Sequence, residues 1–178
     1  MKIRIFSLFL AVLLSAGCGY TTRSLLSGQY KTIYIAQFEN KMDFTDAALS
    51  GNKYKLYKPG LETDVAKATS SRYMLDGNLK PTQEQSSDLV LRGSLVDFRR
   101  DPLRYTDSDD VYEYRLNVVV DLKLYDRHKD EVLWEEKGFT GDYTYFTSGP
   151  AAKSESVAIN EAVNDLARRI VERTVEQW

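Results

Sequence analysis

The side chains that enzymes most often use are sparse in this sequence, and their spacing does not favour catalysis. The single histidine, His128, lies in the polar run Asp126-Arg127-His128-Lys129-Asp130. That run predicts a tight turn with no cysteine or carboxylate at ligand spacing, so we expect His128 to be solvated. Ser148 and Ser154 have no neighbouring base. A Ser/His/Asp catalytic triad is therefore unsupported.

Three glutamates, Glu131, Glu135 and Glu136, are the nearest approach to a pair of acid–base carboxylates. They fall on an alternating segment beside Lys137, where consecutive side chains point to opposite faces, so a face linked by salt bridges is the better interpretation. One cysteine and one histidine are too few for a structural zinc site or an intramolecular disulfide. We expect no catalytic residue, metal or cofactor, and hence no enzyme.

The one residue whose position predicts a reaction is Cys18. Residues 1–4 carry a positive charge, and Ile5–Leu14 is a ten-residue apolar run, too short for a permanent bilayer span but typical of a secretory signal. Ser15-Ala16-Gly17 then places small side chains before the thiol, a nucleophile that can accept a lipid thioether. We interpret 1–17 as a signal peptide and Cys18 as the lipidation site, in a pattern that resembles a bacterial lipobox. The alternative is an ordinary cleaved signal followed by a buried cysteine.

Charge excludes some partners. Loss of Lys2 and Arg4 with the signal lowers the 24 basic residues to 22, against 26 acidic residues, a net charge of −4. That charge does not draw the protein onto nucleic acid or an anionic membrane, so a lipid anchor must set its location. The residue that follows Cys18 is Gly19. By resemblance to the sorting of bacterial lipoproteins, the absence of Asp at that position favours the outer membrane.

The remaining chain predicts one domain, residues 31–178, behind a lipidated tether at 18–30. In the segment 112–125 apolar residues alternate with other residues that include Glu113, Arg115 and Asp121. A slip of one residue would bury these three charged side chains, which fixes the register of the predicted strand. The fold class that follows is α+β: a mostly antiparallel four- to five-stranded sheet with two helices packed on one face. The predicted elements are strands at 31–38, 89–98, 112–125 and 132–145, a possible short strand at 73–79, and helices at 59–72 and 151–176. The stripe of the last helix comprises Ile159, Ala162, Val163, Leu166, Ile170 and Thr174.

Several segments together resemble a known family. They are Cys18-Gly19-Tyr20, Ile33–Asn40, Asp88–Gly93, Tyr114–Val118, Leu133-Trp134, and the helix segments Glu161–Val163 and Leu166–Val171. This order is similar to that of the lipopolysaccharide-assembly lipoproteins of the LptE type, except around 43–57 and in the tail ending at Trp178. The resemblance implies a non-enzymatic outer-membrane component on the periplasmic side. It would plug an LptD-type β-barrel, help that barrel to fold, and contact lipopolysaccharide.

The resemblance gives the arginines a candidate role. Arg92, Arg99, Arg100 and Arg104 are candidates for contact with lipopolysaccharide phosphates, which guanidinium groups bind in a bidentate manner. The segment 99–110 also contains four aspartates, so a solvated loop with local ion pairs is the alternative.

Aromatic residues are dense near the strand ends. Tyr143, Tyr145 and Phe146 are candidates for contact with the barrel, whereas Tyr112 and Tyr114 share the apolar stripe and are expected in the core. A different binding role stays open: an outer-membrane lipoprotein that acts as activator or adaptor of a cell-wall synthase or secretion assembly. A periplasmic hydrolase is the third and weakest alternative.

Overall fold

The computed structural model describes residues 29–43 and 54–175. The predicted signal peptide, Cys18 and Trp178 lie outside these residues. None of the described helices is both long and apolar enough to cross a membrane. The elements in chain order are β1 (Thr32–Ile35), β2 (Glu39–Asn40), α4 (Leu61–Asp76), β3 (Lys80–Pro81), the short 3-10 helix η1 (Glu84–Ser86), β4 (Leu89–Tyr105), β5 (Val111–Asp126), β6 (Glu131–Phe146) and α5 (Glu155–Val175).

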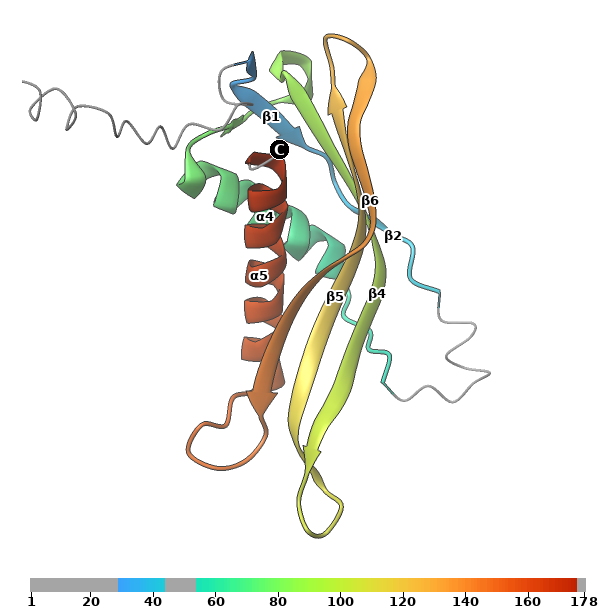
Figure 1. Ribbon diagram of the computed structural model, residues 1–178, viewed down its shortest axis with the longest axis vertical. Helices are drawn as coiled ribbons and strands as arrows, with labels where there is room; N and C mark the ends of the chain where they lie inside the picture. Colours follow the sequence, from blue (N-terminus) through green and yellow to red (C-terminus); the bar gives the residue numbers. More distant parts are fainter. Residues whose placement is uncertain (1–28, 44–53, 176–178) are drawn as a thin grey trace, which may run out of the picture.

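One mixed sheet forms the body of the molecule, in the order β3-β1-β4-β5-β6, with β2 added beside β4. The long strands β4, β5 and β6 form an antiparallel meander, whereas β1 runs parallel to both β3 and β4. Both helices lie on the same side of this sheet (Figure 1). The predicted α+β class is confirmed. The sheet has six strands rather than the predicted four to five, because it includes β2 and β3, which are only two residues long and are hard to recognise in the sequence.

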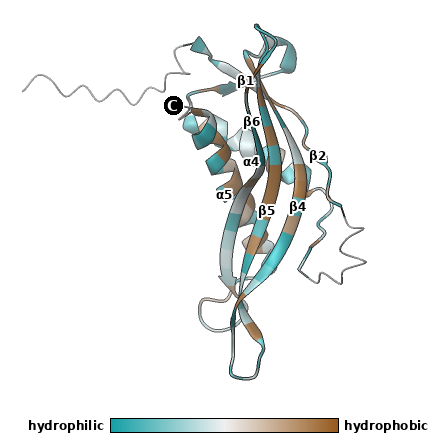
Figure 2. Ribbon diagram, turned by 45° about the vertical axis from the view of Figure 1, so that its right-hand side comes forward, coloured by the Kyte–Doolittle hydropathy of each residue, from teal (hydrophilic) through white to brown (hydrophobic). Residues whose placement is uncertain are grey.

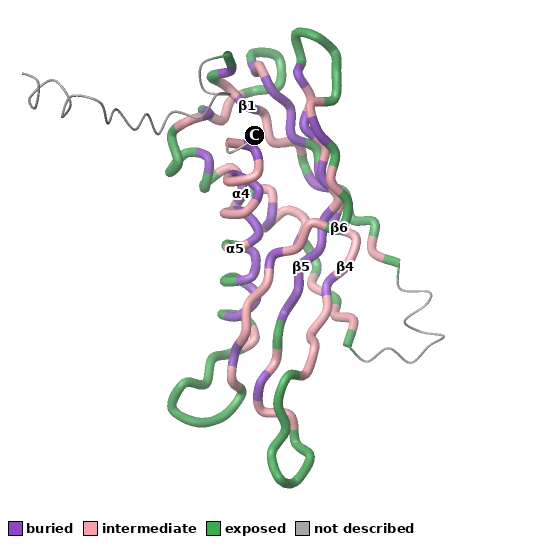
Figure 3. Tube along the Cα trace, in the orientation of Figure 1, coloured by how far each residue is buried: buried purple, intermediate pink, exposed green. Residues whose placement is uncertain are grey.

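Period-two alternation along β5 builds the core. Leu116, Val118, Val120, Leu122 and Leu124 are fully buried under the helices, and hydrophobic residues alternate with hydrophilic ones along the ribbon (Figure 2). The opposite face of the sheet is less exposed to solvent than the alternation predicts, because Glu113, Asn117 and Val119 are buried as well. Exposed residues gather instead at the turns and loops that end the strands (Figure 3).

Helix α5 sits very close to β6. All six residues of its predicted stripe are buried. Gly141 on β6 makes the approach possible, since a Cβ atom there would lie 2.3 Å from the Cβ atom of Leu166. Around this contact Arg169 pairs with Asp165 at 2.7 Å and with Asp142 at 2.8 Å.

The prediction of a short strand at 73–79 is wrong, because 73–76 are helical and the next strand, β3, begins only at Lys80. Helix α4 continues to Asp76 and ends at Gly77, whose positive φ of 79° lets its N–H bond to the Tyr73 carbonyl oxygen at 3.1 Å. Tyr73 is fully buried, and its hydroxyl donates to the Thr174 hydroxyl oxygen of α5 at 2.7 Å. Packing between the two helices therefore decides the conformation of this segment.

The predicted loop at 99–110 is also wrong in its first part, because β4 continues to Tyr105. The strand is held there on both sides. On one side it pairs with β5, Arg99 lying opposite Asn117. On the other, the Leu56 N–H donates to the Phe98 carbonyl oxygen and the Arg100 N–H to the Tyr54 carbonyl oxygen, both at 2.8 Å.

Candidate functional site

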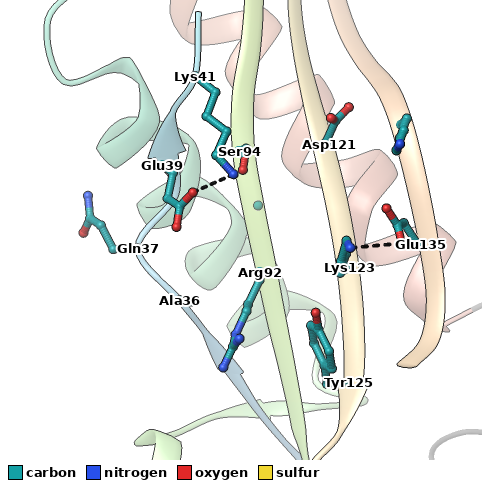
Figure 4. Close-up of a pocket in the computed structure, with 12 residues that line it drawn as sticks. Ala36, Gln37, Glu39, Lys41, Arg92, Ser94, Asp121, Lys123, Tyr125 and Glu135 are labelled. Atoms are coloured by element: carbon teal, nitrogen blue, oxygen red, sulfur yellow. Dashed lines mark ion pairs between the residues drawn. The ribbon is translucent and has the colours of Figure 1, made fainter. Parts of the chain in front are cut away.

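A concave surface lies on the outer face of the sheet, the face opposite the helices (Figure 4). Its volume is about 530 Å³, and we call it the outer-face pocket. Strand pairing brings its wall together, because Arg92 of β4 lies opposite Lys123 of β5, which lies opposite Glu135 of β6. The charged residues that line it are Glu39, Lys41, Arg92, Asp121, Lys123, Glu135 and Lys137.

Most charges in the outer-face pocket are already paired. Lys41 bonds to Glu39 at 2.7 Å and lowers the pKa of that carboxyl. Glu135 bonds to Lys123 at 3.1 Å and raises the pKa of that amine. Asp121 accepts a hydrogen bond from the Gly138 N–H at 2.9 Å.

Two cations of the outer-face pocket remain available. Among the described residues, neither Arg92 nor Lys137 forms an ion pair. The Arg92 guanidinium lies over the Tyr125 ring, 5.1 Å from its centroid, which orients it without neutralising its charge. A concave wall with two unpaired cations, beside carboxylates that can accept hydrogen bonds from hydroxyls, suits a sugar phosphate.

The four candidate arginines are not brought together. Arg92 lines the outer-face pocket, but Arg99 is held by Asp97 at 2.7 Å and Asp101 at 3.1 Å. Arg100 points to the helix side, where it pairs with Glu155. The fourth, Arg104 near the hairpin tip, pairs with Glu113 at 2.9 Å. Three of the four are therefore occupied by carboxylates.

The three aromatic candidates for barrel contact also lie in different environments. Tyr145 is only 3% exposed and belongs to the core, and its hydroxyl donates to Glu155 at 3.5 Å. Tyr143 is half-buried and accepts a hydrogen bond from Lys153. Phe146 is half-buried and stacks on Tyr112, with 6.2 Å between the ring centroids. Only Tyr143 and Phe146 retain surface that a partner can contact.

The residues considered for catalysis do not converge. His128 is 65% exposed, but it is not simply solvated, because its Nε2 atom lies 3.0 Å from an oxygen of Asp88. Glu135 and Glu136 face different partners, Lys123 and Arg173 respectively. Within residues 29–43 and 54–175, no three Cys, His, Asp or Glu side chains gather in a way that holds a metal ion.

Lys137 is the pocket residue that the sequence pattern does not single out. In the sequence it is only the neighbour of Glu135 and Glu136. Its place in the same pocket as Arg92, which lies two strands away on β4, depends on the registers of two strand pairs and on the irregularity between Val120 and Leu122. No local sequence signal encodes that combination.

Several solved structures match this chain, and two of those reported have TM-scores above 0.5. The protein XCC0632 from Xanthomonas campestris matches with a TM-score of 0.51 at 12% identity, over 82% of this chain and 84% of that one. The protein CT253 from Chlamydia trachomatis matches with a TM-score of 0.51 at 10% identity, over 81% and 95%. The rare lipoprotein B from Shewanella oneidensis gives a TM-score of 0.43 at 16% identity, over 79% and 92%. At these identities the likeness is one of fold alone.

Sequence comparison identifies the family. No curated protein is similar enough to this chain to count as a match. The family model LptE, described as lipopolysaccharide-assembly, matches residues 30–174. That span contains every described strand and all but the last residue of α5. Because the match covers most of the chain, this protein belongs to the LptE family of lipopolysaccharide-assembly proteins.

Proposed function

We propose that this protein is an outer-membrane lipoprotein that binds and plugs an LptD-type β-barrel. It is anchored through Cys18 on the periplasmic side, assists assembly of the barrel, and helps to insert lipopolysaccharide at the cell surface. The observation that carries the proposal is the family match over residues 30–174. A binding role also agrees with the dispersed catalytic candidates and with the position of Cys18 after a signal-like segment.

The dimensions of the sheet support a plug. Strands β4, β5 and β6 contain 17, 16 and 16 residues. At about 3.3 Å per residue, strands of this length extend roughly 50 Å, which exceeds the 30 Å hydrocarbon core of a bilayer. A sheet of that length, covered by helices on one side, is long enough to extend through a barrel lumen.

The barrel contact is proposed for the loop end of β6, where Tyr143 and Phe146 retain exposed surface. The neighbouring hairpin between β4 and β5 adds two exposed apolar side chains, Leu103 and Tyr105. Both ends extend in the same direction along the long axis (Figure 1). Large aromatic side chains of this kind provide much of the binding energy in protein interfaces.

Lipopolysaccharide contact is proposed for the outer-face pocket. Arg92 and Lys137 are its two cations without an ion pair among the described residues. The sugar phosphates of lipopolysaccharide carry the charge and the hydroxyls that this mixed wall can bind. Arg99, Arg100 and Arg104 must break existing ion pairs to take the same role, so they rank behind Arg92.

The barrel proposal is tested by depleting the protein from cells. We expect the heat-modifiable LptD-type barrel to become misassembled, because its plug is missing while it folds. A barrel that folds normally, together with a change in cell-wall synthesis, would contradict the proposal and favour the adaptor role.

The glycolipid proposal is tested with the full-length protein carrying Arg92→Gln and Lys137→Gln. Loss of two charge-assisted contacts should weaken binding of purified lipopolysaccharide roughly tenfold. The matched control, Arg127→Gln with Lys153→Gln, removes two exposed cations outside the outer-face pocket and should bind like the unsubstituted protein. Equal binding by both double variants would remove the outer-face pocket from the proposal.

A further inference from the structure

The chain enters the fold at a rigidly held point. The Tyr30 hydroxyl donates to an oxygen of Asp126 at 2.6 Å, and both side chains are buried. The other oxygen of Asp126 accepts the N–H groups of His128 and Lys129, at 2.8 and 3.1 Å. These bonds fasten the beginning of the described chain to the turn between β5 and β6.

A second carboxylate holds the next two residues. Asp88 accepts the backbone N–H groups of Lys31 and Thr32, at 2.8 and 3.0 Å. Gln29 lies eleven positions after Cys18 in the sequence. At no more than about 3.4 Å per position the chain between them spans at most roughly 37 Å, so a lipid at Cys18 holds this end of the molecule near the bilayer.

Helix α4 ends at this same end of the molecule, as the positions of α4 and β1 in Figure 1 show. After α4 the chain passes through Gly77 into β3, where the Lys80 N–H donates to the Lys31 carbonyl oxygen at 2.9 Å. The last turn of α4 exposes two adjacent apolar side chains, Met74 at 64% and Leu75 at 80%. Among the described residues, Leu75 is the most exposed large hydrophobic side chain.

Exposed cations occur on the same helix and at the same end of the molecule as the two exposed apolar side chains. Lys67 and Arg72 are exposed on α4, Lys80 on β3, and Lys31 immediately before β1. The nearby Asp76 carboxylate is engaged by the side chain of Asn78 at 2.9 Å. Exposed apolar side chains close to lysine and arginine can enter a membrane interface, where the cations meet lipid phosphates.

We propose that the end of α4 rests on the bilayer, with Met74 and Leu75 inserted among the lipid headgroups and the flanking cations facing lipid phosphates. The inference rests on the proposed lipidation of Cys18. Two apolar side chains are too small an area for a stable protein interface, but they add usefully to a lipid anchor. The contact fixes the orientation of the long sheet relative to the membrane, which a lipid on a tether alone does not.

The test uses full-length lipidated protein carrying Leu75→Cys, reconstituted into vesicles of phosphatidylethanolamine and phosphatidylglycerol. The matched control is Leu103→Cys, another exposed apolar position at the far end of the sheet. Each thiol is labelled with bimane, and quenching by lipids spin-labelled near the headgroup is measured. A side chain seated roughly 5–10 Å into the interface should be quenched at least about threefold more at position 75 than at position 103.

Equal quenching at the two positions, in vesicles that carry the protein when floated, would overturn the inference. So would a label at position 75 that responds only when purified barrel is added, because that result assigns the surface to a protein partner. The unsubstituted protein separates this failure from that of the lipidation proposal. Its only cysteine is Cys18, so bimane labelling of that protein would show that the thiol is not acylated.

Discussion

Gly141 sets the distance between α5 and the sheet, and the variant Gly141→Ala tests how closely the two are packed. A Cβ atom at this position would lie 2.3 Å from the Cβ atom of Leu166 and 2.5 Å from its Cα and N atoms. Ordinary contacts begin near 3.4 Å, so the helix must retreat by about 1 Å. Gly141 does not have a positive φ, so the cost comes from packing and not from backbone strain.

The expected cost is at the upper end of the range for overpacked cores, about 3 kcal/mol, because the obstructing atoms belong to the helix backbone. For a domain of this size that corresponds to a melting temperature lower by roughly 6–12 °C. Thermal and urea unfolding, followed by circular dichroism, measure both quantities.

A double variant decides whether the reasoning is right. Leu166→Ala shortens the side chain but leaves the Cβ, Cα and N atoms that obstruct Gly141→Ala, so it should not restore stability. A double-mutant cycle should therefore show no stabilising coupling between the two changes. Gly93→Ala offers the contrast, since its Cβ atom would meet only the ring of Phe38, at 2.4 Å, and Phe38→Leu should relieve it in part. Recovery of Gly141→Ala by Leu166→Ala would refute the account of the α5 contact.

Three further predictions follow from the contacts described. Tyr73→Phe leaves a buried hydroxyl without its donor and should lower the free energy of unfolding by about 1–2 kcal/mol in urea; unchanged stability would contradict the buried hydrogen bond. The Lys31 N–H and other donors hold the pKa of Asp88 well below its usual value, so its contribution to stability is present above about pH 4 and is lost as the pH falls further. Asp88→Asn should therefore flatten the fall in urea midpoint between roughly pH 5 and 3, and a fall as steep as before would contradict this. Tyr143→Ser with Phe146→Ser should reduce the barrel that co-purifies several-fold without changing the circular dichroism, and undiminished recovery would exclude the proposed contact.

Periodicity made the core of this fold predictable. The alternation along β5 and the stripe of α5 lie in continuous segments, so each fixes its own buried face. The ion pair between Asp165 and Arg169, four residues apart on one helix, follows from the same local geometry. Glu172 lies within reach of both Arg168 and Arg169 but pairs with Arg168. Arg169 instead pairs with Asp142 of β6, a tertiary contact that the helix sequence does not predict.

The errors arise where distant segments decide the structure. Tyr73 remains helical because its hydroxyl meets Thr174 across about a hundred residues of sequence, which no local propensity expresses. Arg99 and Arg100 are in a strand because β4 pairs with β5 along this stretch and the distant residues Tyr54–Leu56 bond to its other edge.

The candidate site was predictable only in part. Arg92 is in the outer-face pocket, whereas Arg99 and Arg100, which follow it on the same strand, are not. Arg99 lies seven positions further along β4 than Arg92, and its neighbour Arg100 points to the opposite face of the sheet, so shared charge along the sequence carries no information about a shared site. The partner cation Lys137 is visible only once the registers of β4, β5 and β6 are known.

The central claim is that this protein is the partner of a lipopolysaccharide-exporting barrel, and affinity purification from native outer membranes tests it most directly. The full-length, tagged protein is extracted in mild detergent, and the co-purifying proteins are identified by mass spectrometry. The account predicts an LptD-type β-barrel in near-equimolar amount. Recovery of the protein with a cell-wall synthase or a secretion assembly, and with no such barrel, would contradict it.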